Sequence, residues 1–274
     1  MEYLVAALLS GFLLFNSQAT PGKAERMMEK ALRRQFPAAQ VDVNVEGKRG
    51  FDVLNGRFKS VVVNLKGFGR INGLPLTAAP AARKAGHIGR LELRLRDFIF
   101  DDLKVDAADF MFNDVTYDVD ALKEHSVVQI VQSGPAAVHL VVPAAALETL
   151  LGARFKDIEN ARVSAQDGQV RLTGKRAVPV VRVSIPFTLT ATPKIRNGNE
   201  VWLTDPRVAV ENVTGITLPA GRLLSALNPV YVFDPQQRMP FRIRGTGVQA
   251  HDNTLELTAD LTFVPVGQTT TGGS

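Results

Sequence analysis

Apolar side chains recur along this chain with two periods, which predict helices in some segments and strands in others. A helical period of three to four residues marks Ala24–Phe36 and Pro143–Leu151. A period of two marks the segments that follow each predicted helix, namely Val41–Val45, Val61–Leu65, Leu91–Leu95, Val163–Leu172, Val181–Ala191 and Val201–Val210. Each such strand would bury one face and expose the other, as strands of antiparallel sheets commonly do.

Turn residues and a short internal sequence similarity indicate how these elements are grouped. Asn197-Gly198 and Asp167-Gly168 are strong hairpin signals, and Pro219–Leu227 predicts a third, short helix. The segment Arg57–Val61 resembles Arg154–Ile158, which favours two related units. We therefore predict an α+β fold in which strongly curved antiparallel β-sheets wrap on a long N-terminal helix and short helices. The predicted single domain spans residues 20–266, with pseudo-repeated helix-plus-meander units at about 20–135 and 136–266 and a disordered tail at 267–274.

The first 19 residues have the pattern of a secretory signal peptide. Tyr3–Phe15 is almost entirely apolar, and Ser17-Gln18-Ala19 fits the small-x-small cleavage pattern. Glu2 departs from this pattern, because a signal peptide normally begins with a positive charge. We expect export to the periplasm or cell envelope, with association to the membrane if the N-terminus remains uncleaved.

The composition excludes several kinds of chemistry. The 274 residues include no cysteine, which removes disulfides, thiol nucleophiles and cysteine-ligated metals. The formal charge of +5 is spread along the chain without a recognisable RNA- or DNA-binding motif, so we expect no nucleic-acid partner. Neither a Walker A loop, a G-x-S-x-G elbow nor an H-E-x-x-H motif occurs, and we expect no catalytic site, metal or cofactor.

Acidic residues are dense between positions 101 and 124, but their spacing does not match a calcium-binding loop. Asp118 and Asp120 flank Val119 in a strand-like pattern, which predicts that both carboxylates face solvent. We interpret the segment as a solvated face.

Several segments together resemble a known family. They are Gly56-Arg57-Phe58-Lys59-Ser60-Val61-Val62-Val63, Val213-Thr214-Gly215-Ile216-Thr217-Leu218-Pro219 with the leucine-bearing helix after it, and Pro240-Phe241-Arg242-Ile243. In this order, after an exported leader and a basic first helix, they resemble the LmeA-like phospholipid-binding family of bacterial cell-envelope proteins. The resemblance implies a fold related to the tubular lipid-binding proteins, and a non-enzymatic role in binding, or moving, phospholipid or another acyl-chain lipid at the membrane surface.

On this hypothesis, inward apolar side chains hold the acyl chains. The candidate lining residues are Met28, Leu32, Phe58, Val61, Val63, Phe98, Phe100, Phe187 and Leu189. The candidates for contact with the headgroup or the membrane surface are Lys30, Arg33, Arg34, Lys48 and Arg49.

Two other functions remain open from the sequence. A structural or adaptor protein of the envelope would have the same inward apolar residues packed against one another, with no ligand. A hydrolase would need a site assembled from distant residues around His125, His139 or His251.

Overall fold

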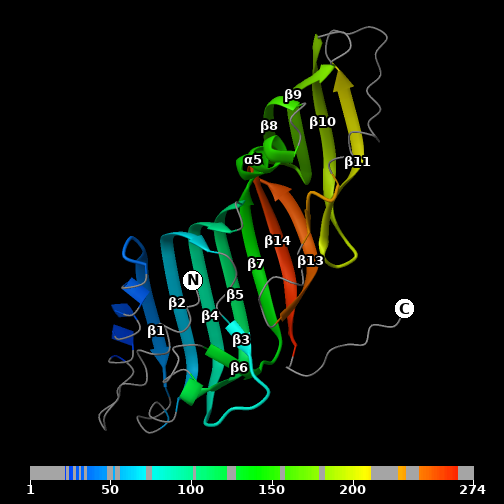
Figure 1. Ribbon diagram of the computed structural model, residues 1–274. Coiled ribbons are helices and arrows are strands. Elements are labelled where there is room, and N and C mark those ends of the chain that lie inside the picture. Colours follow the sequence, from blue (N-terminus) through cyan, green and yellow to red (C-terminus); the bar gives the residue numbers. More distant parts are fainter. Residues whose placement is uncertain are drawn as a thin grey trace.

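The chain forms two β-sheets that lie end to end (Figure 1). The computed structural model describes residues 22, 25–26, 29–30, 32–33, 36–47, 52, 56–71, 76–100, 103–121, 128–154, 158–178, 183–210, 228–232 and 241–264. Strands make up 74% of these residues. The period of two in the sequence is therefore the pattern that dominates the fold.

The larger sheet, sheet A, has nine strands among the described residues. Its strands run in the order β1 (Gln40–Glu46), β2 (Arg57–Ile71), β4 (Ala85–Phe100), β5 (Leu103–Asp118), β7 (Ala136–Pro143), β14 (Thr254–Phe263) and β13 (Phe241–His251). Two short strands, β3 (Leu76–Ala78) and β6 (Val128–Gln132), pair with each other, and β6 also pairs with β5. Sheet A thus joins strands from both halves of the chain, and the division into two repeated units stays a prediction.

The smaller sheet, sheet B, follows the helix α5 (Ala144–Arg154), which connects β7 to it. Its order is β12 (Tyr231–Val232), β11 (Glu200–Val210), β10 (Val183–Arg196), β9 (Gln169–Val178) and β8 (Ile158–Gln166). Both predicted hairpin turns are confirmed, with positive φ angles at Asp167, Gly168, Asn197 and Gly198. The helix predicted at Pro143–Leu151 is confirmed as α5.

The predicted fold class is wrong, because the protein is mostly β and its sheets are not wrapped on a long N-terminal helix. Described residues between Gly22 and Arg33 are helical, but they lie beside the edge strand β1 (Figure 1). The amphipathic pattern therefore indicates a segment that packs at one edge of the fold. Pairing is also not wholly antiparallel, since β2 pairs with β4, and β3 with β6, in parallel. The helices predicted from Ala24 to Phe36 and from Pro219 to Leu227 lie partly or wholly outside the described residues.

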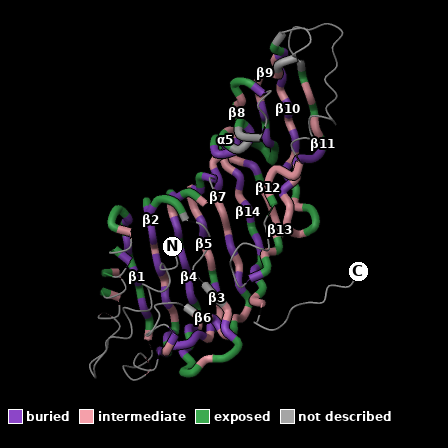
Figure 2. The backbone as a smooth tube through the Cα atoms, in the orientation of Figure 1, coloured by how far each residue is buried: buried purple, intermediate pink, exposed green. Residues whose placement is uncertain are grey.

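Burial alternates along the strands as the sequence predicts (Figure 2). In β1, Val41, Val43 and Val45 are buried while the residues between them are exposed. The exceptions occur at irregular positions such as Asp97 and Asp114, which have positive φ angles of 52° and 50°. At these two positions the alternation skips one residue, so that Leu95 and Phe98, and likewise Phe112 and Val115, are buried although they lie three positions apart.

One turn joins the two sheets. Asp252 and Asn253 connect β13 to β14, and both have positive φ, as type I′ hairpin turns require. The N–H of Asn253 donates to the carbonyl of Ala165 in β8 at 2.8 Å, and its carbonyl accepts from the N–H of Ala144 in α5 at 2.9 Å. A further bond runs from the N–H of Gly168 to the carbonyl of Ala250 at 2.8 Å.

At the opposite end of sheet A, Tyr117 fills a narrow space beneath two glycines. Its ring is fully buried, and its hydroxyl donates to the carbonyl of Gly56 at 3.1 Å. Burial raises the pKa of the Tyr117 hydroxyl, so it remains a donor at any ordinary pH. A β-carbon added to Gly86 would lie 2.4 Å from the Tyr117 ring. Glycine is required at position 86 because any residue with a β-carbon would clash with the Tyr117 ring.

The residue after Tyr117 is a buried carboxylate, so the prediction that Asp118 faces solvent is wrong. Asp118 is 4% exposed, and its carboxylate accepts from the N–H groups of Arg83, Asp120 and Ala121 at 2.8–3.1 Å. Burial alone would raise the pKa of Asp118, but these backbone donors outweigh burial and hold the pKa below its usual value. Asp118 thus ties the segment before β4 to the end of β5.

We predict that Gly86→Ala lowers the free energy of unfolding by about 1–3 kcal/mol, because the new methyl group forces Tyr117 to move. The matched control is Gly152→Ala in α5, where a β-carbon meets nothing within 4 Å. This control should raise the free energy of unfolding, by up to about 1 kcal/mol, because alanine favours helix. Urea unfolding of both variants makes the comparison, and equal effects would contradict the packing described for Tyr117.

We predict that Asp118→Asn lowers the free energy of unfolding by about 1–3 kcal/mol at pH 7, because the charged acceptor is lost. The lowered pKa of Asp118 means that its contribution exists above the unfolded-state pKa of about 3.9 and is lost as the pH falls through the folded-state pKa. Unfolding curves from pH 7 down to pH 3 should show the two proteins converging. A constant difference at all pH values would contradict this role.

Candidate functional site

Three rows of apolar residues cross the inner face of sheet A from one edge to the other. Each row follows register partners through seven strands. The rows are Val41–Leu65–Leu95–Ala108–Leu140–Leu257–Val248, Val43–Val63–Leu93–Phe110–Val138–Ala259–Gly245 and Val45–Val61–Leu91–Phe112–Ala136–Leu261–Ile243. With neighbouring strands about 4.8 Å apart, each row is about 29 Å long.

Aromatic rings lie toward both edges of this face. Phe68 stacks on Phe98 with ring centroids 5.1 Å apart, and Phe36 meets the edge of Phe68 at 5.7 Å. On the other side, Phe241 lies 5.2 Å from Phe112 and 5.7 Å from Phe263. The sequence interpretation missed Phe68, because Gly67 interrupts the alternation before it.

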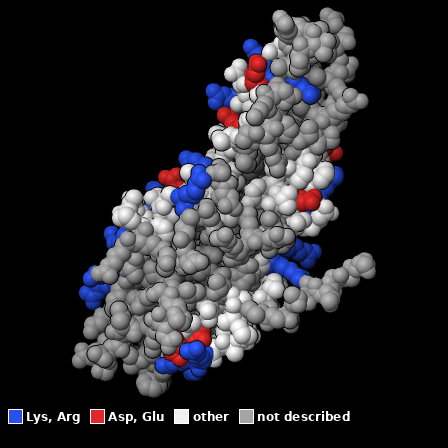
Figure 3. Space-filling model, in the orientation of Figure 1, with Lys and Arg blue, Asp and Glu red and all other residues white. Residues whose placement is uncertain are grey.

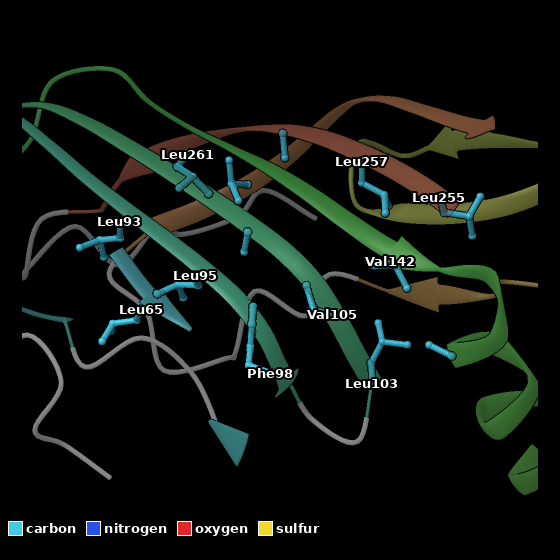
Figure 4. Close-up of a cluster of buried hydrophobic side chains, with 14 of the residues drawn as sticks. Leu65, Leu93, Leu95, Phe98, Leu103, Val105, Val142, Leu255, Leu257 and Leu261 are labelled. Atoms are coloured by element: carbon cyan, nitrogen blue, oxygen red, sulfur yellow. The ribbon is translucent and has the colours of Figure 1, made fainter. Parts of the chain in front are cut away.

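The apolar face continues into sheet B without a break. Figure 4 shows buried side chains from β4, β5, β7 and β14, among them Phe98, Leu103, Val142 and Leu255, along the part of the sheet that leads toward α5. The buried side chains of β8 to β11, including Phe187 and Leu189, belong to the same contiguous cluster. The junction at Asn253 therefore joins the two sheets at a place where their buried faces form one apolar interior.

The structure places the predicted lining residues in two groups. Phe58, Val61 and Val63 of β2 and Phe98 of β4 are at most 4% exposed on the inner face of sheet A, and Phe100 is partly buried against the same cluster. Leu32 is fully buried in this cluster. Phe187 and Leu189 of β10 are buried in sheet B instead, and Met28 lies outside the described residues.

The predicted headgroup residues lie at the β1 edge where the structure describes them. Arg33 donates to the carbonyl of Val41 at 3.0 Å and lies 3.9 Å from Glu29. Its guanidinium group therefore covers an unpaired carbonyl of the edge strand. Lys30 is exposed, and Arg26, Glu29, Lys30 and Arg33 line a shallow hollow of about 360 Å³. Arg34, Lys48 and Arg49 lie outside the described residues.

The outer face of sheet A carries a lattice of charged groups. Glu92 lies between Arg90 and Arg94 with N–O distances of 2.6 Å to each, and its side chain is only 11% exposed. Arg96 pairs with Asp109 of β5 at 2.7 Å. A hollow of about 380 Å³ opens here, and Met111, Ala137 and Asp260 are among the residues that line it. The carboxylates of Glu92 and Asp109 are thus each paired with at least one arginine of β4.

Two of the histidines of the sequence analysis lie beside the same carboxylate. Glu256 lies between His139 at 3.2 Å and His251 at 3.0 Å, on the outer face of sheet A. His125 lies outside the described residues. Within the described ranges, no group of three or more His, Asp or Glu could hold a metal ion. No helix in the part of the chain that the structure describes is long and apolar enough to cross a membrane.

One comparison with known proteins identifies the chain. The family model for LmeA-like phospholipid-binding proteins matches residues 17–260. No curated protein and no solved structure matches the chain. The family match covers both sheets and the turn that joins them.

We predict that Glu92→Gln lowers the free energy of unfolding by about 1–3 kcal/mol, because Arg90 and Arg94 lose their shared and largely buried counter-charge. The matched control is Glu46→Gln, since Glu46 pairs with Lys59 at 2.6 Å but both side chains are more than half exposed. Exposed pairs contribute little, so the control should unfold like the wild type. Urea unfolding in low and high salt tests this, and an equal loss in both variants would contradict it.

Proposed function

The chain belongs to the LmeA-like phospholipid-binding family, and we propose that it is an exported, non-enzymatic protein that holds phospholipid acyl chains against its apolar inner face. The observation that carries the proposal is the set of three apolar rows across seven strands of sheet A. A bilayer interior, two acyl chains thick, measures about 30 Å. A row of about 29 Å is therefore long enough for one acyl chain to lie along it.

The chemistry of the inner face fits such a ligand. Each buried methylene group contributes about 0.8 kcal/mol, so a two-chain lipid can bind tightly without a specific polar contact. We propose Leu32, Phe58, Val61, Val63, Phe98 and Phe100 as acyl-chain contacts in sheet A. Because the interior is continuous, Phe187 and Leu189 of sheet B would contact the same ligand or a second chain. A continuous apolar interior also favours movement of lipid along the protein.

The location follows from the same proposal. A protein that exchanges phospholipid must meet a membrane, and the signal-like N-terminal sequence directs the chain to the cell envelope. Lys30 and Arg33 line the same shallow hollow at the β1 edge, and Lys30 is exposed. Because both side chains are positively charged, they would contact lipid phosphate there.

One observation favours the structural alternative. Val63, Leu93 and Leu95 are 0% exposed, so the protein itself covers the centre of the inner face. If this packing is permanent, the interior is a filled core and the protein is an adaptor without a ligand.

The test compares two large-to-small substitutions, Phe98→Ala and Ile185→Ala. Ile185 is 3% exposed but does not belong to the contiguous cluster that includes Phe98. Both variants should lose roughly 2–5 kcal/mol of unfolding free energy. Only Phe98→Ala should reduce the phospholipid that co-purifies with the protein, measured by solvent extraction and normalised to folded protein. Unchanged lipid in Phe98→Ala would contradict the proposed lining.

A further inference from the structure

The outer face of sheet B presents a straight row of polar side chains across four strands. Ser164, Arg171, Thr190 and Arg207 are successive register partners on β8, β9, β10 and β11. Leu189 and Ala191, which flank Thr190, are buried on the opposite face, so this row points outward. Arg171 and Arg207 stand one strand to either side of Thr190, about 10 Å apart along the sheet.

The acidic groups of this sheet are mostly engaged. Glu148 accepts from Arg162 at 3.2 Å and from the N–H of Val163 at 2.9 Å. The Lys194 ammonium group, 3.1 Å away, and the Thr204 hydroxyl lower the pKa of Asp205. Glu159 accepts from the Ser184 hydroxyl at 3.2 Å. Asp167 is an exception, but it lies in the β8–β9 turn at the end that contacts β13.

Three cations of the same face have no such partner. Arg171, Lys175 and Arg207 are exposed, and within the described ranges none of them makes an ion pair or a side-chain hydrogen bond. Figure 3 shows basic side chains at the end of the molecule that sheet B forms, with acidic side chains among them, and further basic side chains over sheet A. Lys175 is the register partner of Glu159, whereas Arg171 and Arg207 have a carboxylate neither as an ion-pair partner nor as a register partner.

The single tryptophan of the chain lies on this face as well. Trp202 of β11 is partly exposed, and it is the register partner of Lys194. The Arg196 guanidinium group lies 4.8 Å from its ring centroid, and its Nε1 donates to Glu200 at 2.6 Å. Tryptophan beside arginine and lysine is typical of surfaces that meet the headgroup layer of a membrane.

We propose that the outer face of sheet B docks on the surface of an anionic phospholipid bilayer. Arg171, Lys175 and Arg207 would attract the phosphates, the hydroxyl groups of Thr190 and Ser164 would donate to them, and Trp202 would enter the headgroup layer. The inference rests on the proposed function, because docking brings the protein to its lipid. Strand β10 would then present Thr190 to the bilayer and Leu189 to the acyl chains inside the protein.

The experiment uses Trp202 as its own probe, since no other tryptophan contributes to the emission. The protein is titrated with vesicles of phosphatidylcholine alone and with vesicles containing 30% phosphatidylglycerol. We expect a blue shift of the emission only with the anionic vesicles, reversed by high salt. The double variant Arg171→Glu/Arg207→Glu should bind at least about 25-fold more weakly, since each basic residue near such a surface contributes about fivefold.

The control variant Arg57→Glu/Lys66→Glu makes the same charge change at two exposed positions of sheet A, and it should bind like the wild type. Equal weakening in both variants would overturn the proposal, because only net charge would then matter. Salt-sensitive binding to duplex DNA with the same loss in the Arg171/Arg207 variant, and none to vesicles, would overturn it in favour of nucleic acid. Co-purified lipid is measured in parallel. Binding to anionic vesicles by a protein that retains no lipid would contradict the proposed function but would still support the docking surface on sheet B.

Discussion

The turn at Asp252 and Asn253 is the constraint on which the arrangement of the two sheets depends. Its backbone bonds to Ala144 and Ala165 fix β13 and β14 against both α5 and β8. A side-chain bond from the N–H of Ala165 to Asn253 Oδ1 at 3.3 Å adds to them. Because β13 is the last strand of sheet A, these contacts place the apolar face of one sheet directly beside that of the other. The β10–β11 turn reinforces the junction, since the N–H of Gly245 donates to the carbonyl of Gly198 at 2.7 Å.

The two faces of each sheet have different physical roles. The inner faces form one interior that offers only dispersion and the hydrophobic effect, which discriminate poorly between headgroups but bind acyl chains well. The outer face of sheet A balances its charges internally, through Glu92 between two arginines and Asp109 with Arg96. On the outer face of sheet B, Arg171 and Arg207 have no carboxylate as an ion-pair or register partner, so their charge can act on a partner molecule.

Local sequence patterns predicted segments of β1, β2, β4 and β8–β11, because a period of two is a property of neighbouring residues, but they did not predict β5, β7 or β13. They also predicted α5 and two hairpin turns, where Pro143 and the Asp-Gly and Asn-Gly pairs act locally. They failed where the outcome depends on distant segments. The parallel pairing of β2 with β4 and the burial of Asp118 depend on contacts between segments far apart in the chain. The fold class was wrong because a helical pattern says nothing about where the helix packs.

For the candidate site, too, the sequence predicted local properties but not those that depend on distant segments. The sequence marked Val61, Val63 and Phe98 as inward residues, and their burial on one face agrees with that orientation. It did not show that register aligns them in rows across seven strands, and it grouped Phe187 with them although Phe187 lies in the other sheet. It also passed over Arg171, Arg207 and Trp202, because Arg171 lies 31 positions before Trp202 and 36 before Arg207 and comes to the same face only through the pairing of β9, β10 and β11.

Native mass spectrometry of the full chain, purified without added lipid, tests the central claim most directly. If the inner face holds acyl chains, the spectrum should contain protein with one or two additional masses that solvent extraction identifies as phospholipid. The fraction carrying lipid should rise after incubation with vesicles. A protein that remains at its bare mass before and after incubation would contradict the account and favour a filled, structural core.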